Sequence, residues 1–327
     1  MEYKKLGNSE LKVSRIGLGC MGFGVPDDHH PWTITEEEAK KIVARALELG
    51  VNFFDTAMGY SGGTSEEFLG RIIKKLTKRE NVVLATKFLP RMEDEITSGI
   101  DGKDHVLNCL NASLKRLDTG YVDLYICHMW DYHTPIEQIM EGLNEAVVTG
   151  KARAIGISNC YAWQLEKANA IAEKNGWAKF ISVQGHYNLI FREEEREMVP
   201  CCKDGNIALT PYSPLAAGRL VKPIGEVTKR GQLDNIAKSK YDNTKEQDEI
   251  IIRRVAEIAQ KRGYTTTQVA LGWLLTKVTS PIVGATKIKH IEEAAAAVYA
   301  ELSSEEIAYL EEPYVPHKLV GVMQFNH

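Results

Sequence analysis

Short runs of β-branched and apolar residues alternate with longer amphipathic stretches along most of the chain. The short runs predict buried strands, whereas the longer stretches repeat apolar residues at three and four positions, as helices do. Strands are expected at 15–19, 51–56, 81–86, 122–127, 152–158, 180–184, 206–212 and 280–285. The clearest helical patterns lie at 35–50, 104–118, 135–150 and 161–176. Gly50, Gly150 and Gly176 close three of these patterns, where a helix end favours a left-handed residue.

Strands that alternate with helices predict a parallel sheet, and eight such strands predict a (β/α)8 TIM barrel. A doubly wound sheet is the alternative, and it requires a glycine-rich turn that opens the first helix. The glycines of GLGCMGFG are instead followed by PDDHHPW, which starts no helix, so the barrel is favoured. The segment 4–13 predicts a small β-hairpin at the barrel floor, before the first strand. No linker divides the chain, so residues 1–327 are expected to form one barrel domain.

The longest stretch without an expected element lies at 213–247, after the seventh strand. A long loop on the active face of a barrel is often functional, and a basic loop suits a phosphorylated ligand; a solvated surface loop is the alternative. Its basic residues outnumber its acidic ones, the former being Arg219, Lys222, Lys229, Arg230, Lys238, Lys240 and Lys245, the latter Glu226, Asp234, Asp242 and Glu246.

Charge and composition exclude several classes of function. The net charge is −4 and the pI is near 6.2, without the basic excess of a nucleic-acid binder. No apolar run is long enough to cross a membrane, and the first residues lack the apolar core of a signal peptide. The cysteines form no C-x-x-C pair, and His29 and His30 have no evident partner set, so no metal site is expected. These features together predict a cytoplasmic protein.

Four side chains with acid–base chemistry follow consecutive expected strands: Asp55, Tyr60, Lys87 and His128. A barrel brings the carboxyl ends of its strands to one face, so these residues are expected to meet there. The pKa of a free tyrosine is too high for an efficient acid, and a nearby ammonium lowers it. An aspartate would keep the lysine charged, and a histidine would orient a carbonyl. Each residue alone would fit a structural role, but the set predicts general acid catalysis with Tyr60 as the proton donor.

The segment GVNFFDTAMGYSGGTSEEFLG at 50–70 resembles the first signature of the aldo-keto reductases, with Asp55 and Tyr60 at its catalytic positions. The strings ATK and YICHMWD place Lys87 and His128 in the same way. This resemblance runs from the hairpin to the end of the chain. It implies a TIM barrel, a nicotinamide cofactor bound in an extended form, and hydride transfer to small-molecule aldehydes or ketones.

Three further segments, 130–143, 187–200 and 313–321, are similar to a bacterial branch of general aldo-keto reductases. That branch also resembles, more distantly, the potassium-channel β-subunits. A redox-sensing barrel that regulates a partner is therefore the alternative to an enzyme, and the intact set of four residues favours the enzyme.

The resemblance also implies how the cofactor is held. Ser158, Asn159 and Gln184 would hold the nicotinamide carboxamide, Tyr212 would stack on the nicotinamide ring, and the loop SPLAAGRL would bind the pyrophosphate. The complete set of expected cofactor residues is Gly19, Met21, Asp55, Ser158, Asn159, Gln184, Tyr212, Ser213, Pro214, Leu215, Gly218, Arg219, Gly284, Thr286, Lys287, His290 and Glu293.

The segment 284–294 resembles the adenosine-binding end of the family, and it departs from the family pattern at His290 and Ala294. Thr286 supplies a hydroxyl and Lys287 an ammonium where a helix is expected to begin, which suits a 2′-phosphate. NADP(H) is therefore the expected cofactor.

The substrate pocket is expected to draw on aromatic and apolar loop residues, which favour apolar or ring-bearing carbonyls. Residues 25–31 are expected to form a mobile lid beside it. The expected pocket residues are Met21, Trp32, Tyr60, His128, Trp130 and Tyr132.

Overall fold

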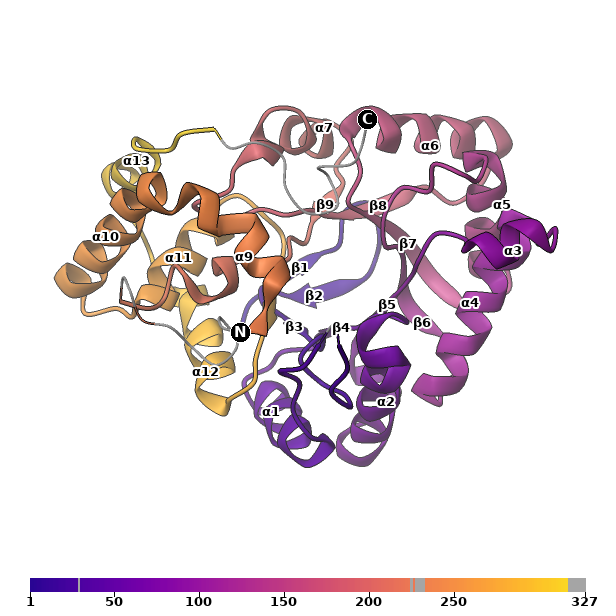
Figure 1. Cartoon of the computed structure of the whole chain (residues 1–327), viewed down its shortest axis with the longest axis horizontal. Helices are drawn as coiled ribbons and strands as arrows, with labels where there is room; N and C mark the ends of the chain where they lie inside the picture. The colour runs from indigo at the N-terminus through magenta and orange to yellow at the C-terminus, as the bar shows by residue number, and fades with distance from the viewer. Residues whose placement is uncertain (29, 224–225, 227–232, 317–327) are drawn as a thin grey trace.

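The computed structural model describes residues 1–28, 30–223, 226 and 233–316, and it has a central sheet surrounded by helices (Figure 1). The sheet has eight parallel strands in the order β10–β3–β4–β5–β6–β7–β8–β9. These strands are β3 (Gly17–Gly19), β4 (Phe53–Asp55), β5 (Val83–Phe88), β6 (Val122–Cys127), β7 (Ala152–Ser158), β8 (Phe180–Gln184), β9 (Ala208–Leu209) and β10 (Ile282–Gly284). The predicted hairpin precedes them as β1 (Tyr3–Lys5) and β2 (Lys12–Ser14).

Backbone hydrogen bonds join the two ends of this strand order and close the sheet. The Thr279 N–H donates to the Leu209 carbonyl at 3.0 Å, and the Ile282 N–H donates to the Pro211 carbonyl at 2.9 Å. The prediction of a (β/α)8 TIM barrel with an N-terminal hairpin is therefore confirmed.

Several strands are shorter than the apolar runs that predicted them, and β9 shows why. Pro211 has no N–H to give to a ladder. The amides of Thr210 and Tyr212 still donate to the Val183 and Gly185 carbonyls, so the chain follows β8 beyond the two residues of the regular strand. The apolar pattern thus marks the buried segment correctly but overestimates the length of the hydrogen-bonded ladder.

Helices cover the outside of the barrel. The four helical patterns identified from the sequence are confirmed to within two residues as α1 (Glu36–Glu48), α4 (Gly102–Leu117), α5 (Ile136–Val148) and α6 (Ala162–Asn175). The other helices described are α2 (Thr64–Leu76), α3 (Glu93–Thr97), α7 (Met198–Asp204), α9 (Asn235–Tyr241), α10 (Lys245–Arg262), α11 (Thr266–Leu275), α12 (Ile288–Ala296) and α13 (Ser304–Glu311). Among the described residues, no helix combines the length and apolarity that a membrane crossing requires.

The expectation of an irregular stretch over 213–247 is wrong in its second half. Asp234 caps α9 by accepting a hydrogen bond from the Ala237 N–H at 2.9 Å, and α10 already begins at Lys245. The basic residues Lys229 and Arg230 of this stretch lie outside the described residues.

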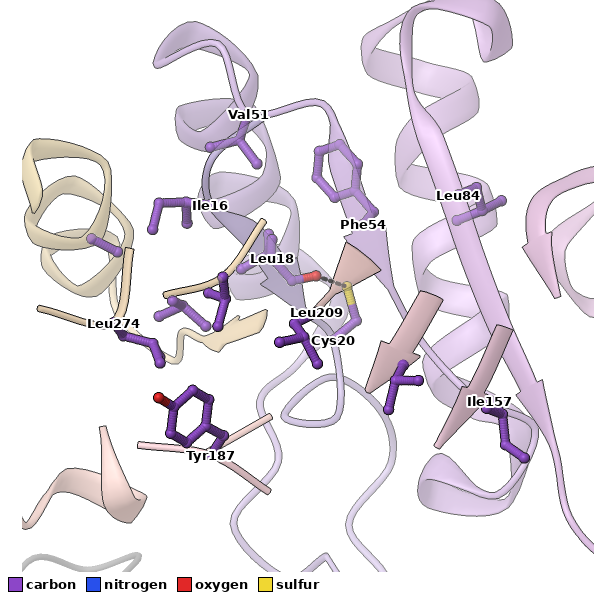
Figure 2. Close-up of a cluster of buried hydrophobic side chains, with 14 of the residues drawn as sticks. Ile16, Leu18, Cys20, Val51, Phe54, Leu84, Ile157, Tyr187, Leu209 and Leu274 are labelled. Atoms are coloured by element: carbon purple, nitrogen blue, oxygen red, sulfur yellow. Dashed lines mark hydrogen bonds between the residues drawn. The ribbon is translucent and has the colours of Figure 1, made fainter. Parts of the chain in front are cut away.

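Side chains alternate between two cores because a strand turns successive residues to opposite faces. Inside the barrel, Phe53, Ala85 and Leu124 pack in one cluster with Leu6 and Val13, from the start and end of the hairpin, which therefore closes the floor. The residues between them on the strands face the helices. Figure 2 shows this outer core, in which Leu18, Phe54, Leu84 and Ile157 pack as buried side chains.

Arg15 ties the beginning of the barrel to its last segments. Its side chain is 6% exposed, and its guanidinium donates to the carbonyls of Leu275, Val278 and Thr279. These carbonyls lie at and just after the end of α11, where a helix leaves acceptors without partners. A single cation therefore caps α11 and holds it beside the first strand.

Replacing Arg15 by Ala is expected to lower the free energy of unfolding by about 2 to 4 kcal/mol, because it leaves buried carbonyls without donors. Denaturant unfolding measures the change. Arg253→Ala is the matched control, because the Arg253 side chain is 67% exposed on α10. Equal stability of the two variants would show that the carbonyls find other donors.

Candidate active site

The two-residue period of the strands places a polar layer directly above the apolar interior. Asp55 comes two residues after Phe53 on β4, and Lys87 two residues after Ala85 on β5. Neighbouring strands pair in register, with Asp55 opposite Ala85. The carboxyl ends of adjacent strands therefore bring both charged side chains to the same mouth, as the sequence predicted.

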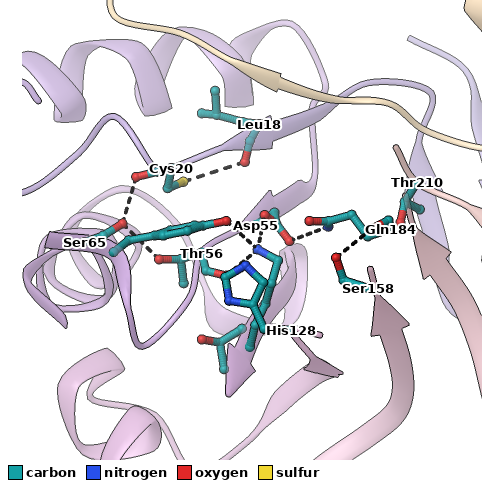
Figure 3. Close-up of polar contacts among 12 residues, drawn as sticks. Leu18, Cys20, Asp55, Thr56, Ser65, His128, Ser158, Gln184 and Thr210 are labelled. Carbon is teal, nitrogen blue, oxygen red and sulfur yellow. Dashed lines mark hydrogen bonds and ion pairs between the residues drawn. The ribbon is translucent and has the colours of Figure 1, made fainter. Parts of the chain in front are cut away.

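Lys87 is the centre of this layer. Its ammonium donates to Asp55 Oδ1 at 2.6 Å, to the Thr56 carbonyl at 2.8 Å and to Tyr60 Oη at 3.1 Å. The side chain is 0% exposed, so all three donors of the ammonium are used by the protein. Asp55 is fixed from the far side of the barrel, where Gln184 Nε2 donates to Asp55 Oδ2 at 2.9 Å (Figure 3).

Tyr60 reaches this cluster from a tight turn after β4. The turn η1 (Tyr60–Gly63) places Ser61, Gly62 and Gly63 in the left-handed region, with φ of 48°, 60° and 90°. A Cβ at position 63 would lie 2.7 Å from the Cδ of Arg116, so glycine is required there by space as well as by φ. Backbone strain of this kind is typical of functional sites.

The pKa values of this cluster reflect burial and charge together. Burial raises the pKa of Tyr60, and the Lys87 ammonium opposes this only in part, so the pKa lies above its ordinary value. The prediction that the lysine lowers the pKa of Tyr60 is therefore wrong for the net shift. Desolvation of the phenolate outweighs its attraction to the Lys87 ammonium. Burial lowers the pKa of Lys87, but Asp55 and Tyr60 raise it by a larger amount. The net pKa therefore lies above its ordinary value, and the lysine stays an ammonium.

His128 lies beside the cluster as a neutral imidazole. Burial, together with the charge of Lys87, lowers the pKa of His128 to about 3. Its ring centroid is 5.8 Å from that of Tyr60, with the ring planes at 82°. Its Nδ1 is buried without a hydrogen-bond partner among the described residues.

A chain of hydrogen bonds continues from this cluster along the ends of β7, β8 and β9. Ser158 Oγ donates to the Gln184 carbonyl at 2.7 Å, and Asn159 Nδ2 donates to Ser158 Oγ at 2.9 Å. Tyr212 Oη donates to Asn159 Oδ1 at 3.0 Å. The structure therefore brings the four residues expected to face the nicotinamide together with the acid–base cluster.

Aromatic rings and a second lysine surround Tyr212, and no pattern in the sequence predicts this group. The His186 ring stacks on Tyr212 at a centroid distance of 5.3 Å and on Phe191 at 4.1 Å. Tyr241 Oη, at the end of α9, lies 2.6 Å from His186 Nε2. Lys240 Nζ lies 4.5 Å from the centre of the Tyr212 ring. These residues come from α9 and from the segments after β8 and β9, so no short motif connects them.

The loop after β9 contains several residues in the left-handed region. Ser213, Ala216, Ala217 and Gly218 all have positive φ, of 52°, 49°, 53° and 94°. The N–H groups of Ala216, Gly218 and Arg219 donate to carbonyls within the same loop, at 3.0, 2.9 and 3.1 Å. The expected contact of this loop with the pyrophosphate therefore stays a prediction. Arg219 is held differently from the expectation, because its guanidinium donates to Asp242 at 2.5 Å.

The segment after β10 presents a cluster of positive charge. Lys287 is exposed at the start of α12 and forms no ion pair with a described residue. Burial lowers the pKa of His290, and the charges of Lys287, Lys222 and Lys289 lower it further. Glu293 accepts a hydrogen bond from Thr267 Oγ1 at 2.9 Å, so this acid is already bound. The strand end itself is open, because nothing lies within 4 Å of a Cβ built at Gly284.

The other expected site residues divide into two groups. Gly19 is buried beside Asp55 in register, and Trp32 lies 6.2 Å from the His30 ring, which in turn lies 6.0 Å from the Tyr60 ring. The expected lid at 25–31 includes His29, which lies outside the described residues. Met21, half-buried just after β3, has no specific contact with the cluster.

Trp130 and Tyr132 form the second group. They line a cavity of about 350 Å³ together with Lys167 of α6, and neither Tyr60 nor His128 lines it. Trp130 also packs against Trp163, with ring centroids 6.1 Å apart. The expected contact of these two rings with the substrate therefore stays a prediction.

The whole barrel matches a known family. The model of the Aldo/keto reductase family matches residues 15–314. Versiconal hemiacetal acetate reductase of Aspergillus parasiticus is 42% identical over 337 residues, which cover 97% of this chain and 98% of that protein. The aldo-keto reductase dtxS3 of Metarhizium robertsii is 40% identical, covering 98% of this chain and 93% of its own length.

A solved structure agrees with this match. The thermostable aldo-keto reductase Tm1743, crystallised with the inhibitor epalrestat, superposes with a TM-score of 0.76 at 29% identity. The match covers 96% of this chain and 100% of that one.

Removing one charge of the buried Asp55–Lys87 pair is expected to lower the free energy of unfolding more than removing both charges. Asp55→Asn leaves an uncompensated ammonium and Lys87→Met an uncompensated carboxylate, so each should lower the free energy of unfolding by about 3 to 5 kcal/mol. The double variant removes both charges and should lose much less than the sum. Denaturant unfolding of the three variants measures this coupling.

The exposed pair Lys5–Glu10 is the control, because its N–O distance of 2.7 Å is similar but both side chains face solvent. Glu10→Gln should leave the unfolding midpoint unchanged. Additive losses at Asp55 and Lys87 would contradict a coupled buried pair.

Proposed function

Because the chain belongs to the aldo/keto reductase family, we propose that it reduces aldehydes or ketones with a nicotinamide cofactor, Tyr60 donating the proton. One observation carries the proposal: the fully buried Lys87 ammonium is bonded at once to Asp55 and to Tyr60. When bound, the reduced cofactor supplies the hydride that adds to the carbonyl carbon. The protein must then deliver a proton to the carbonyl oxygen.

The geometry supports a separate task for each residue of the cluster. Lys87 donates to Tyr60 Oη, which leaves the phenolic O–H free to point at a substrate oxygen. As this proton moves, the ammonium stabilises the phenolate that forms. Asp55 keeps Lys87 charged and in place. His128, neutral because its pKa is lowered to about 3, donates a hydrogen bond to the carbonyl oxygen rather than a proton.

The raised pKa of Tyr60 agrees with this assignment. Desolvation keeps the phenol protonated at neutral pH, so the acid is present in its active form when the substrate arrives. The proton leaves only when negative charge develops on the carbonyl oxygen, which is the condition for general acid catalysis.

The described residues fit a nicotinamide dinucleotide along the mouth of the barrel. Amide and hydroxyl groups of Ser158, Asn159 and Gln184 gather beside the acid–base cluster, and the loop after β9 is the segment that the family resemblance assigns to the pyrophosphate. The lysines around His290 suit the 2′-phosphate of NADP(H). We therefore take NADP(H) as the cofactor, with residues 1–327 forming one domain.

The substrate we propose is a small aldehyde or ketone with an apolar or ring-bearing group. His30 lies beside Tyr60 and Trp32 lies beside His30, while Trp130 and Tyr132 line a cavity of their own. Placement in a bacterial branch of the family stays a prediction, since both relatives described above are fungal.

Tyr60→Phe keeps the ring and removes the hydroxyl, so turnover should fall by a factor of about 10² or more while the dissociation constant for NADPH stays the same. Loss of NADPH absorbance with a panel of aromatic aldehydes measures turnover. Tyr309→Phe, on the exposed surface of α13, is the control. A wild-type protein that binds NADPH but consumes none with any carbonyl would favour the redox-sensing alternative.

Cofactor choice is tested at Lys287. Removing its ammonium by Lys287→Ala should raise the Michaelis constant for NADPH by about tenfold and leave that for NADH nearly unchanged, because only NADPH carries the 2′-phosphate. Steady-state kinetics with both cofactors measures the difference, and Lys277→Ala, which lies before β10, is the control. Equal effects on the two cofactors would show that Lys287 does not contact this phosphate.

A further inference from the structure

Lys240 is a buried cation beside the ring that is proposed to stack on the nicotinamide. It belongs to α9, it is 9% exposed, and its Nζ lies 4.5 Å from the centre of the Tyr212 ring. The same ammonium donates to Tyr212 Oη at 3.4 Å. Neither the family resemblance nor the acid–base cluster gives this lysine a role.

Its position is fixed by contacts on both sides of it in the chain. Tyr241 Oη lies 2.6 Å from His186 Nε2 and accepts a hydrogen bond from Asn188 Nδ2 at 3.1 Å. Asp242, the next residue, accepts from Arg219 at 2.5 Å. These bonds anchor the end of α9 to the segments after β8 and β9, so Lys240 is held over the mouth rather than in solvent.

The charge on this lysine persists at neutral pH. Burial lowers the pKa of Lys240 to about 8, and the negative charge of Asp234 works in the opposite direction. The side chain is therefore mostly an ammonium under ordinary conditions. A charge kept in so little water interacts strongly with any other charge that enters the mouth.

We propose that Lys240 is a specificity-determining residue that makes the site bind the reduced nicotinamide more tightly than the oxidised one. The oxidised ring carries a positive charge and the reduced ring carries none, although both have nearly the same shape. The Lys240 ammonium lies 4.5 Å from the centre of the Tyr212 ring, so a nicotinamide bound against Tyr212 would be repelled by it only in the oxidised form. This inference rests on the proposed function, because it requires the nicotinamide to stack on Tyr212.

The preference has a direct consequence for the reaction. After hydride transfer to a carbonyl, the oxidised cofactor would lie near Lys240, where repulsion would weaken its binding and speed its release. The site therefore favours carbonyl reduction over alcohol oxidation. Electrostatic contacts of this kind act on the difference between two ligands of similar shape, which is what specificity requires.

The test compares the dissociation constants of NADPH and NADP⁺, measured by fluorescence titration. Lys240→Met keeps the length of the side chain and removes its charge. It should lower the ratio of the NADP⁺ constant to the NADPH constant by about tenfold, mainly through tighter binding of NADP⁺. Lys240→Arg keeps the charge and should keep the ratio. Lys238→Met, on the same helix with its Nζ 3.5 Å from Asn235, is the matched control and should also keep it.

The outcomes separate this inference from the proposed function. If Lys240→Met leaves the ratio unchanged, or shifts both constants equally, Lys240 does not distinguish the two oxidation states, and the proposed function stands. If the wild-type protein binds neither nucleotide, the proposed function fails and this inference fails with it.

Discussion

The fully buried ammonium of Lys87 is stable in this barrel only because the end of β4 and the turn after it surround it with partners. Lys87 has its donors satisfied by Asp55, Thr56 and Tyr60, and Asp55 is held in turn by Gln184 from β8. A buried charge that loses its partner is strongly destabilising, so these strands must keep their relative register. The geometry of the site therefore depends on the same strand register that keeps the barrel intact.

The same constraint explains how an apolar core and a reactive polar layer share one sheet. Each inward-facing position along a strand lies two residues from the next, so a strand that fills the barrel with Phe53 also presents Asp55 at the mouth. The hairpin closes the opposite end with Leu6 and Val13. Water is thereby excluded from below, and the low polarity around Lys87 and His128 follows from this closed floor.

The sequence alone predicts those parts of the site that depend on local period. Asp55, Lys87 and His128 follow adjacent strands, so their meeting follows from a parallel barrel. The contacts of Lys240 and Tyr241 are different, because α9 is short and its packing against His186 and Tyr212 has no periodic signature. The sign of the net pKa shift at Tyr60 also depends on the extent of burial, which a pattern of residue types does not give.

Arg15 makes the completion of the barrel depend on residues far apart in the chain. Its acceptors lie 260 to 264 residues later, at the end of α11 and just beyond it. During synthesis, Arg15 and the adjacent strand β3 therefore emerge long before the segment that accepts the hydrogen bonds of Arg15 and before β10, which covers the open edge of β3. An unpaired strand edge is a template for pairing with other chains. The nascent protein thus carries a risk of aggregation at this strand, and the risk ends only when the last quarter of the chain has been made.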